Sequence, residues 1–145
     1  MTYQIAVFVS HSWSYGDHYS KINEWIFNEN WQSDGEKIEF YNTSVPRSDP
    51  IHGARNASEL QRRIYERIQA CHIVVCPMGM YSTHSFWIER ELDGALLYRR
   101  PILAVNPWAQ ERKSSVVRNR ANHEVGWNKK SVVDGIWKLT RGNRT

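Results

Sequence analysis

Short apolar runs that alternate with helical segments constrain the fold of this chain most strongly. Residues 5–9 form a continuous run that is partly β-branched, and similar runs occupy residues 72–76 and 102–105. Runs of this kind are typical of strands that helices cover on both faces. Weaker strand patterns lie at residues 37–41 and 125–127. The alternation therefore predicts an α/β fold with a parallel sheet and helices on both faces.

The segments between these runs carry the helical spacing of apolar side chains. We expect helices at residues 17–31, from residue 58 onward, at residues 85–98 and at residues 131–139, with a short basic helix inside residues 111–121. Residues 42–56 hold two prolines and read as a long loop, a length that is often functional in compact domains. Ligands of parallel sheets bind at the carboxyl ends of the strands, so this loop and the residues after each strand are the candidate positions.

The size and composition fit one globular domain over residues 1–145. Apolar residues make up 41% of the chain, which is enough to bury a core. The longest apolar runs are far shorter than the roughly 20 residues that cross a bilayer, and the N-terminus lacks the basic start of a secretory signal. We therefore expect a cytoplasmic protein without membrane contact, in which Cys71 and Cys76 are reduced and buried.

The charge is distributed unevenly along the chain. Residues 1–98 contain 8 Lys and Arg against 12 Asp and Glu, whereas residues 99–145 contain 11 against 3. A basic block of this kind could bind nucleic acid. Its charges are scattered among apolar positions, however, so we expect solvated helix faces and keep nucleic acid binding only as a third and weaker interpretation.

The common motifs for cofactor and metal chemistry are absent from the sequence. Neither G-x-G-x-x-G nor G-x-x-x-x-G-K occurs, which removes the main support for hydride transfer and for nucleoside triphosphate hydrolysis. The six histidines show no paired ligand spacing, so we expect no metal site. Ser10 and His11 lack the glycines of a nucleophile elbow, and we interpret them as part of a turn that lines a ligand site.

A second candidate position lies on the helix expected at residues 85–98. Trp87 and Glu91 are four residues apart and so share one helix face, which would place a carboxylate beside a large apolar ring. The alternative is a core tryptophan and a surface glutamate. Helical spacing alone leaves both interpretations open.

Several segments together resemble a TIR-type domain, and specifically the ThsB-like TIR proteins of bacterial Thoeris anti-phage defence. The resemblance rests on the first strand and its turn, the long loop, the third helix and the region after the fourth strand. The matching segments are residues 7–13 (VFVSHSW), 41–46 (YNTSVP), 49–54 (DPIHGA), 79–87 (GMYSTHSFW), 100–102 (RPI), 106–112 (NPWAQER) and 125–128 (VGWN). Nearly the whole chain is covered.

The resemblance implies a flavodoxin-like sheet of five parallel strands in the order 2-1-3-4-5. It also implies an enzyme that cleaves NAD, as substrate and not as a bound cofactor, at the nicotinamide–ribose bond. The ADP-ribose-derived product, often cyclic, would act as a second messenger for a separate effector protein. TIR catalysis commonly needs self-assembly, and in defence it would respond to a phage trigger. The long loop occupies the position that TIR domains use between subunits.

The family's catalytic glutamate lies four residues after the helix tryptophan, which carries this role onto Glu91. Glu89 is the second choice; the two differ by about 200° of helical rotation, so only one can face a given ligand. The residues that we expect to contact NAD are Phe8, Ser10, His11, Asn42 and Trp87. The alternative function is a catalytically silent TIR adaptor that acts through protein contacts.

Overall fold

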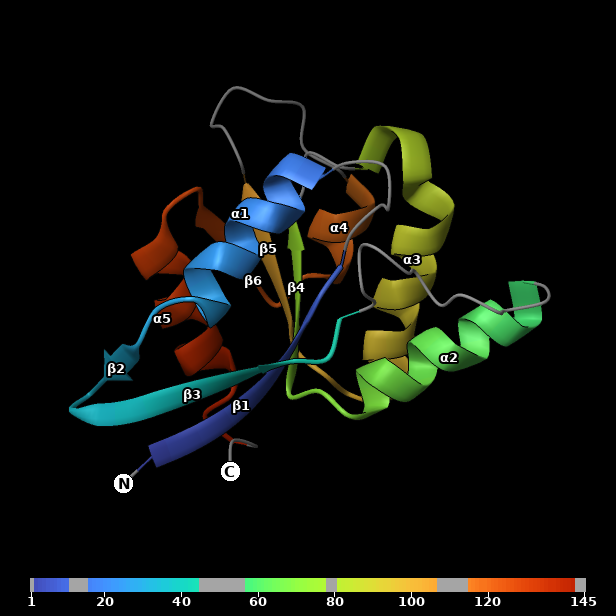
Figure 1. Ribbon diagram of the computed structural model, residues 1–145. Coiled ribbons are helices and arrows are strands. Elements are labelled where there is room, and N and C mark those ends of the chain that lie inside the picture. Colours follow the sequence, from blue (N-terminus) through green and yellow to red (C-terminus); the bar gives the residue numbers. More distant parts are fainter. Residues whose placement is uncertain (1, 11–15, 45–56, 78–80, 107–114, 143–145) are drawn as a thin grey trace.

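The computed structural model describes residues 2–10, 16–44, 57–77, 81–106 and 115–142. Its strands are β1 (Thr2–Val9), β2 (Trp31–Ser33), β3 (Glu36–Asn42), β4 (Ile73–Pro77), β5 (Ile102–Asn106) and β6 (His123–Gly126). Its helices are α1 (Gly16–Phe27), α2 (Ala57–Gln69), α3 (Tyr81–Leu97), α4 (Ser115–Arg120) and α5 (Lys129–Leu139). Figure 1 shows the helices on both sides of a single twisted sheet, which confirms the α/β class.

The sheet differs in detail from the expected five parallel strands. It has six strands in the order β2-β3-β1-β4-β5-β6, and β2 pairs with β3 in the antiparallel direction. The other neighbours, β3 with β1, β1 with β4, β4 with β5 and β5 with β6, are all parallel. The expected strand number and the wholly parallel sheet are therefore wrong, because a short edge strand is added beside β3.

The added strand also corrects the predicted end of the first helix. Trp31 belongs to β2 and not to α1, which ends at Phe27. The hairpin between β2 and β3 turns at Asp34 and Gly35, with φ angles of 52° and 77°. Two consecutive positive φ angles are typical of the type I′ turn, which suits the twist of a two-residue hairpin. The indole Nε1 of Trp137 donates to Asp34 Oδ2 at 2.7 Å and so ties this hairpin to α5.

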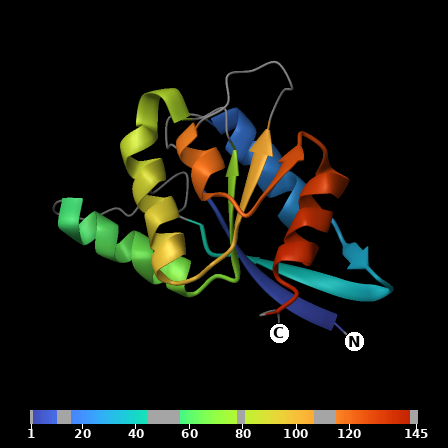
Figure 2. The same cartoon turned by 180° about the vertical axis from the view of Figure 1, so that it is seen from behind.

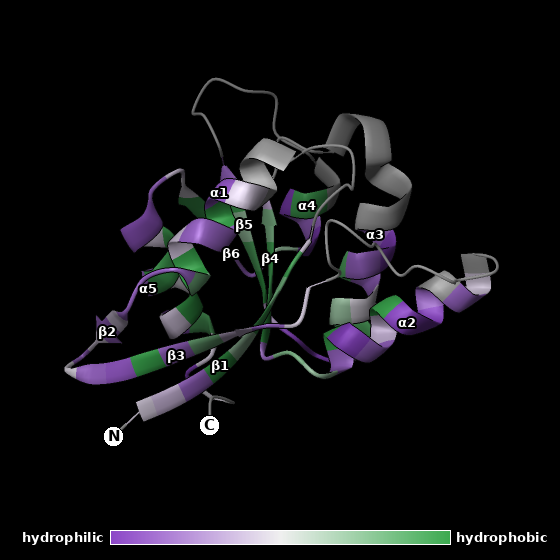
Figure 3. Ribbon diagram, in the orientation of Figure 1, coloured by the Kyte–Doolittle hydropathy of each residue, from purple (hydrophilic) through white to green (hydrophobic). Residues whose placement is uncertain are grey.

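The core lies in two layers, one on each face of the sheet (Figures 2 and 3). One layer packs α1 and α5 against the sheet and includes Ile5, Val7, Val9, Ile22, Ile26, Leu103, Val132 and Ile136. The other packs α2, α3 and α4 and includes Phe8, Ile64, Ile68, Val74, Cys76, Leu92, Ala104 and Val117. Both cysteines are buried as free thiols, as predicted.

The position of α3 depends on a close contact with α2. A Cβ atom at Gly94 would lie 2.8 Å from the ring of Tyr65, so a larger residue there would push the two helices apart. The guanidinium of Arg90 donates to the side-chain oxygen of Gln61 on α2. Glycine therefore lets α3 approach closely and carry its inward side chains to the sheet.

Within the described ranges, no helix has the length and apolarity needed to span a membrane.

One histidine side chain completes the bonding between the two central strands. His72 precedes β4; its backbone N–H donates to the carbonyl of Ala6, and its Nδ1 accepts the N–H of Ala6, each at 2.8 Å. An acceptor at Nδ1 requires this nitrogen to be unprotonated. Burial, and secondarily the positive charge of Arg100, lower the pKa of His72 below its usual 6.5.

The lowered pKa of His72 predicts a loss of stability in mild acid. The unfolded chain binds the proton more readily than the folded chain, so this contribution is complete above about pH 6.5 and is lost as the pH falls through the folded-state pKa. His72→Asn keeps an acceptor near the Nδ1 position but cannot titrate. Denaturant unfolding between pH 5 and pH 8 should show a flatter profile for the variant than for the parent chain. Identical profiles would exclude a role for His72 in this pH range.

Candidate functional site

The candidate site lies at the carboxyl end of β1, on the sheet face that α3 covers. Ser10 follows the last residue of β1, and its N–H donates to the carbonyl of Val75 at 2.8 Å, which extends the parallel pairing by one residue. Side chains alternate along a strand, so Ser10 points to the same face as Phe8, toward α3. Ser10 is 1% exposed.

Glu91 of α3 meets Ser10 at this position. The Ser10 hydroxyl donates to Glu91 Oε1 at 3.3 Å, and Glu91 is 4% exposed. Burial raises the pKa of Glu91 well above its usual value, and the Ser10 hydrogen bond opposes this shift. The interpretation of Glu91 as a surface glutamate is therefore wrong. A buried carboxyl with a perturbed pKa at the ligand-binding edge of a sheet is a candidate for catalysis.

A thiol completes this cluster, although its place in an apolar run predicted only a core side chain. Cys76 of β4 is fully buried, and its pKa is raised to about 12 by burial and secondarily by the charge of Glu91, while a hydrogen bond with Ser10 lowers it. A thiol with such a pKa stays protonated near neutral pH and is a poor nucleophile. Cys76 is thus a neutral neighbour of the Glu91 carboxyl.

The second glutamate of α3 has a different environment. Glu89 Oε1 accepts from Arg120 of α4 at 3.2 Å, and the Glu89 side chain is 46% exposed. Arg120 also pairs with Asp93 at 2.9 Å, so the arginine joins α4 to the outer face of α3. The two carboxylates therefore face different sides of the helix, as their spacing predicts.

Phe8 lies on the same face of β1 as Ser10, two residues before it. Phe8 is fully buried, within the core layer that α2, α3 and α4 form, as Ser10 and Glu91 are also buried. Its contact with the nicotinamide ribose stays a prediction.

Asn42 is not brought together with Glu91. It lies at the end of β3, where its side-chain amide donates to Asn23 Oδ1 of α1 at 3.4 Å and its Oδ1 accepts from the N–H of Ser44 at 2.9 Å. With Ser20, Glu24, Phe27 and Asn28, these two asparagines line a cavity of about 410 Å³. Asn42 therefore belongs to the face that α1 covers, opposite the face of Glu91.

The remaining expected contacts lie outside what the structure describes. His11, and residues 45–56 of the long loop expected at residues 42–56, fall outside the described residues. Trp87 is part of α3, but its side chain is also outside the described part. The contacts of His11 and Trp87 with NAD, and the role of the loop in self-assembly, stay predictions.

Ser44, which the sequence did not single out, lies two residues after β3 and supports the end of β1. Its Oγ accepts the N–H of Val9 at 2.7 Å, and its carbonyl accepts from Arg67 of α2 at 3.1 Å. Ser44 is 5% exposed. A single serine after a strand carries no signal in the sequence, because its role depends on the parallel pairing of β3 with β1.

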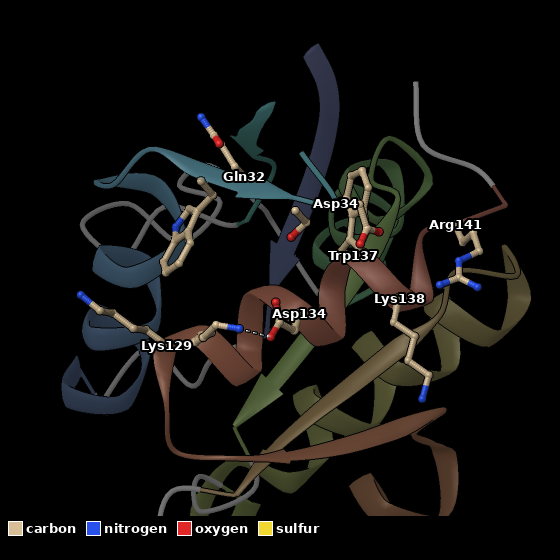
Figure 4. A pocket seen from close by; sticks show the side chains of 10 residues that line it. Gln32, Asp34, Lys129, Asp134, Trp137, Lys138 and Arg141 are labelled. Carbon is tan, nitrogen blue, oxygen red and sulfur yellow. Dashed lines mark hydrogen bonds and ion pairs between the residues drawn. The ribbon is translucent and has the colours of Figure 1, made fainter. Parts of the chain in front are cut away.

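A larger cavity lies elsewhere, between the hairpin of β2 and β3 and helix α5 (Figure 4). It has a volume of about 730 Å³. Its charged side chains include Lys130, which pairs with Asp134 at 3.2 Å, and Lys129, which pairs with Glu29 at 3.0 Å. In Figure 4, Lys129, Lys138 and Arg141 point in different directions, so they do not converge on one anion.

Within the described ranges, no three His, Cys, Asp or Glu residues gather as a metal site would require.

The comparison with solved structures matches proteins of very different sequence. The chain is similar to a 3-dehydroquinate dehydratase-like protein from Bifidobacterium longum, with 12% identity, coverage of 97% of both chains and a TM-score of 0.46. It is also similar to part of the translation elongation factor SelB from Methanococcus maripaludis, solved with the GTP analogue GppNHp, with 10% identity and a TM-score of 0.53. That match covers all of this chain and 35% of the factor, and at this identity it shows the fold alone.

The comparison with family models is more specific. No curated protein matches the chain closely. The model of the TIR-like domain of the Thoeris protein ThsB matches residues 8–112, which include Ser10, Cys76 and Glu91. This match spans well over half of the chain, and so the chain belongs to the ThsB TIR-like domain family of the Thoeris defence system.

Proposed function

We propose that this chain cleaves NAD at the nicotinamide–ribose bond and that Glu91 is the catalytic carboxylate. One observation carries the proposal: in a ThsB-like TIR chain, the buried Glu91 carboxyl meets Ser10 at the carboxyl end of a central parallel strand. Parallel sheets bind their ligands at this edge. Glu89, exposed and paired with Arg120, has none of these properties.

The chemistry of glycosidic bond cleavage suits a buried carboxylate. Departure of nicotinamide leaves positive charge on the ribose, in an oxocarbenium-like transition state. An ionised Glu91 stabilises this charge, and the stabilisation is larger where water is excluded. Ser10 holds the carboxyl in place through its hydroxyl, so little reorganisation is needed when the charge develops.

Because the pKa of Glu91 is raised, its carboxyl needs a nearby positive charge in order to ionise. A buried carboxyl favours the neutral form, whereas a nearby positive charge favours the ionised form. The nicotinamide ring of NAD is itself cationic, so bound substrate promotes the ionisation that catalysis needs. Glu91 is therefore matched to NAD and poorly matched to a neutral ligand.

The product belongs to the same proposal. An ADP-ribose-derived product, cyclic if the ribose is captured by the adenine of the same molecule, would serve as the signal for a separate Thoeris effector. Self-assembly and a phage trigger would control the rate. The alternative is a silent adaptor, for which the buried carboxyl would have no chemical purpose.

The first test separates the enzyme from the adaptor. Glu91→Gln keeps the shape of the side chain but cannot ionise, so we expect nicotinamide release to fall by at least about 100-fold, the scale of a lost electrostatic contact in a transition state. The matched control is Glu89→Gln, on the exposed side of the same helix, which should keep most of the activity. Chromatography of NAD incubated with concentrated protein, followed by mass analysis of the product, measures both. An inactive parent chain at high concentration and in infected cells would favour the adaptor.

The second test uses the pH dependence of Glu91. The folded-state pKa of Glu91 is raised, so the folded chain binds this proton more tightly than the unfolded chain. The stability that this provides is complete below about pH 4.5 and is lost as the pH rises through the folded-state pKa. Catalysis has the opposite dependence, because it needs the carboxylate. In the parent chain, activity should therefore rise with pH while stability, relative to Glu91→Gln, falls. A variant that is less stable than the parent at pH 8 would contradict the burial of an ionisable carboxyl here.

A further inference from the structure

Asn106 lies on the same face and at the same edge of the sheet as the cluster of Ser10, Cys76 and Glu91. Ala104 of β5 pairs with Cys76 of β4 and belongs to the core layer beneath α3. Side chains alternate along a strand, so Asn106 points to the face of Ala104, about 6.6 Å further toward the carboxyl end. The last positions of β1, β4 and β5 thus bring Ser10, Cys76 and Asn106 to one side of the sheet.

The side chain of Asn106 is buried and has an unused acceptor. Asn106 is 9% exposed, and its Oδ1 has no hydrogen-bond partner within the part of the chain that the structure describes. A buried acceptor without a partner costs stability, because water has been removed from it without replacement. Asn122, next to the opposite end of β5, shows the ordinary case: its Oδ1 accepts the N–H of Ile102 at 2.8 Å.

The unused Oδ1 acceptor of Asn106 determines which groups of a ligand can bind beside it. An oxygen acceptor needs a donor, which excludes the phosphate oxygens of NAD and leaves its hydroxyl and amino groups. This step rests on the proposed function, in which Glu91 and Ser10 contact the ribose at the bond that breaks. Apart from the ribose hydroxyls, the donor of NAD that lies beside the bond that breaks is the carboxamide N–H of nicotinamide.

We propose that Asn106 recognises the nicotinamide carboxamide by accepting a hydrogen bond from its N–H. This contact gives the site its specificity for the amide over the acid form of the base. The deamido analogue of NAD carries a carboxylate at this position, which offers no donor and would face the Oδ1 acceptor with a negative charge. A site built to bond a substrate N–H rejects analogues that lack it.

The test compares Asn106→Leu, of similar volume but without an acceptor, with Asn122→Leu. Asn106→Leu should lower kcat/KM for NAD by about tenfold and should raise kcat/KM for nicotinic acid adenine dinucleotide, whose carboxylate no longer faces the Oδ1 acceptor, so the preference for NAD falls. Asn122→Leu should keep the preference of the parent chain. Equal losses on both substrates would assign Asn106 to the ribose, and no loss on either would remove it from the site; both results overturn the proposal.

A stability measurement tests the same inference without NAD. Removing an unused buried acceptor should raise the melting temperature, by about 2–4 °C, whereas Asn122→Leu removes a bonded acceptor and should lower it. A melting temperature lowered to the same extent by both substitutions would show that Asn106 is bonded within the fold, and would overturn the proposal.

Calorimetric binding of NAD to Glu91→Gln, with and without Asn106→Leu, separates the two proposals. If the parent chain does not cleave NAD but Asn106→Leu weakens NAD binding, the proposed function fails and the carboxamide contact stands. If the parent chain cleaves NAD and Asn106→Leu changes neither binding nor preference, only the carboxamide contact fails. Absence of both cleavage and binding overturns both.

Discussion

The burial of the Glu91 carboxyl against the end of β1 is the constraint on which the organisation of this molecule depends. A carboxyl that is 4% exposed must have a polar partner, and Ser10 supplies it. Ser10 can do so because its own backbone is held in the parallel pairing with β4, and because Ser44, just after β3, bonds the preceding residue. Neighbouring segments of the sheet thus position one hydroxyl, and the contact of α3 with α2 at Gly94 positions the carboxyl opposite it.

This arrangement places two groups that lower the stability of the free chain at one edge of an otherwise well-packed sheet. The strands β4 and β5 are buried at every position, and their carboxyl ends carry Cys76 and Asn106 on the face of the carboxyl. An ionisable group with a raised pKa and an unused acceptor both reduce stability in the free chain. Such costs are common where a site is prepared for a ligand, because the ligand supplies the missing charge or donor.

Three basic side chains of the last third of the chain pair with acidic groups of other elements. Arg120 links α4 to α3, Arg118 pairs with Glu124 at 3.2 Å, and Lys129 reaches Glu29 beyond the end of α1. These pairs are largely exposed, so each contributes little to stability. Their effect is to distribute the positive charge over several elements, which agrees with the interpretation of the basic block as solvated helix faces.

Local patterns in the sequence determined the alternation of strands and helices, the buried strands and the opposite orientation of Glu89 and Glu91, because periodicity and apolar runs report burial directly. The similarity of its motifs to those of TIR proteins determined the family. Only the tertiary structure decided that β2 joins the sheet and that Asn42 lies on the face opposite Glu91. The burial of Glu91 and the positions of Ser44, Cys76 and Asn106 were decided in the same way. Each depends on which residues of separate strands stand side by side, and pairing register is a long-range property that no single segment encodes.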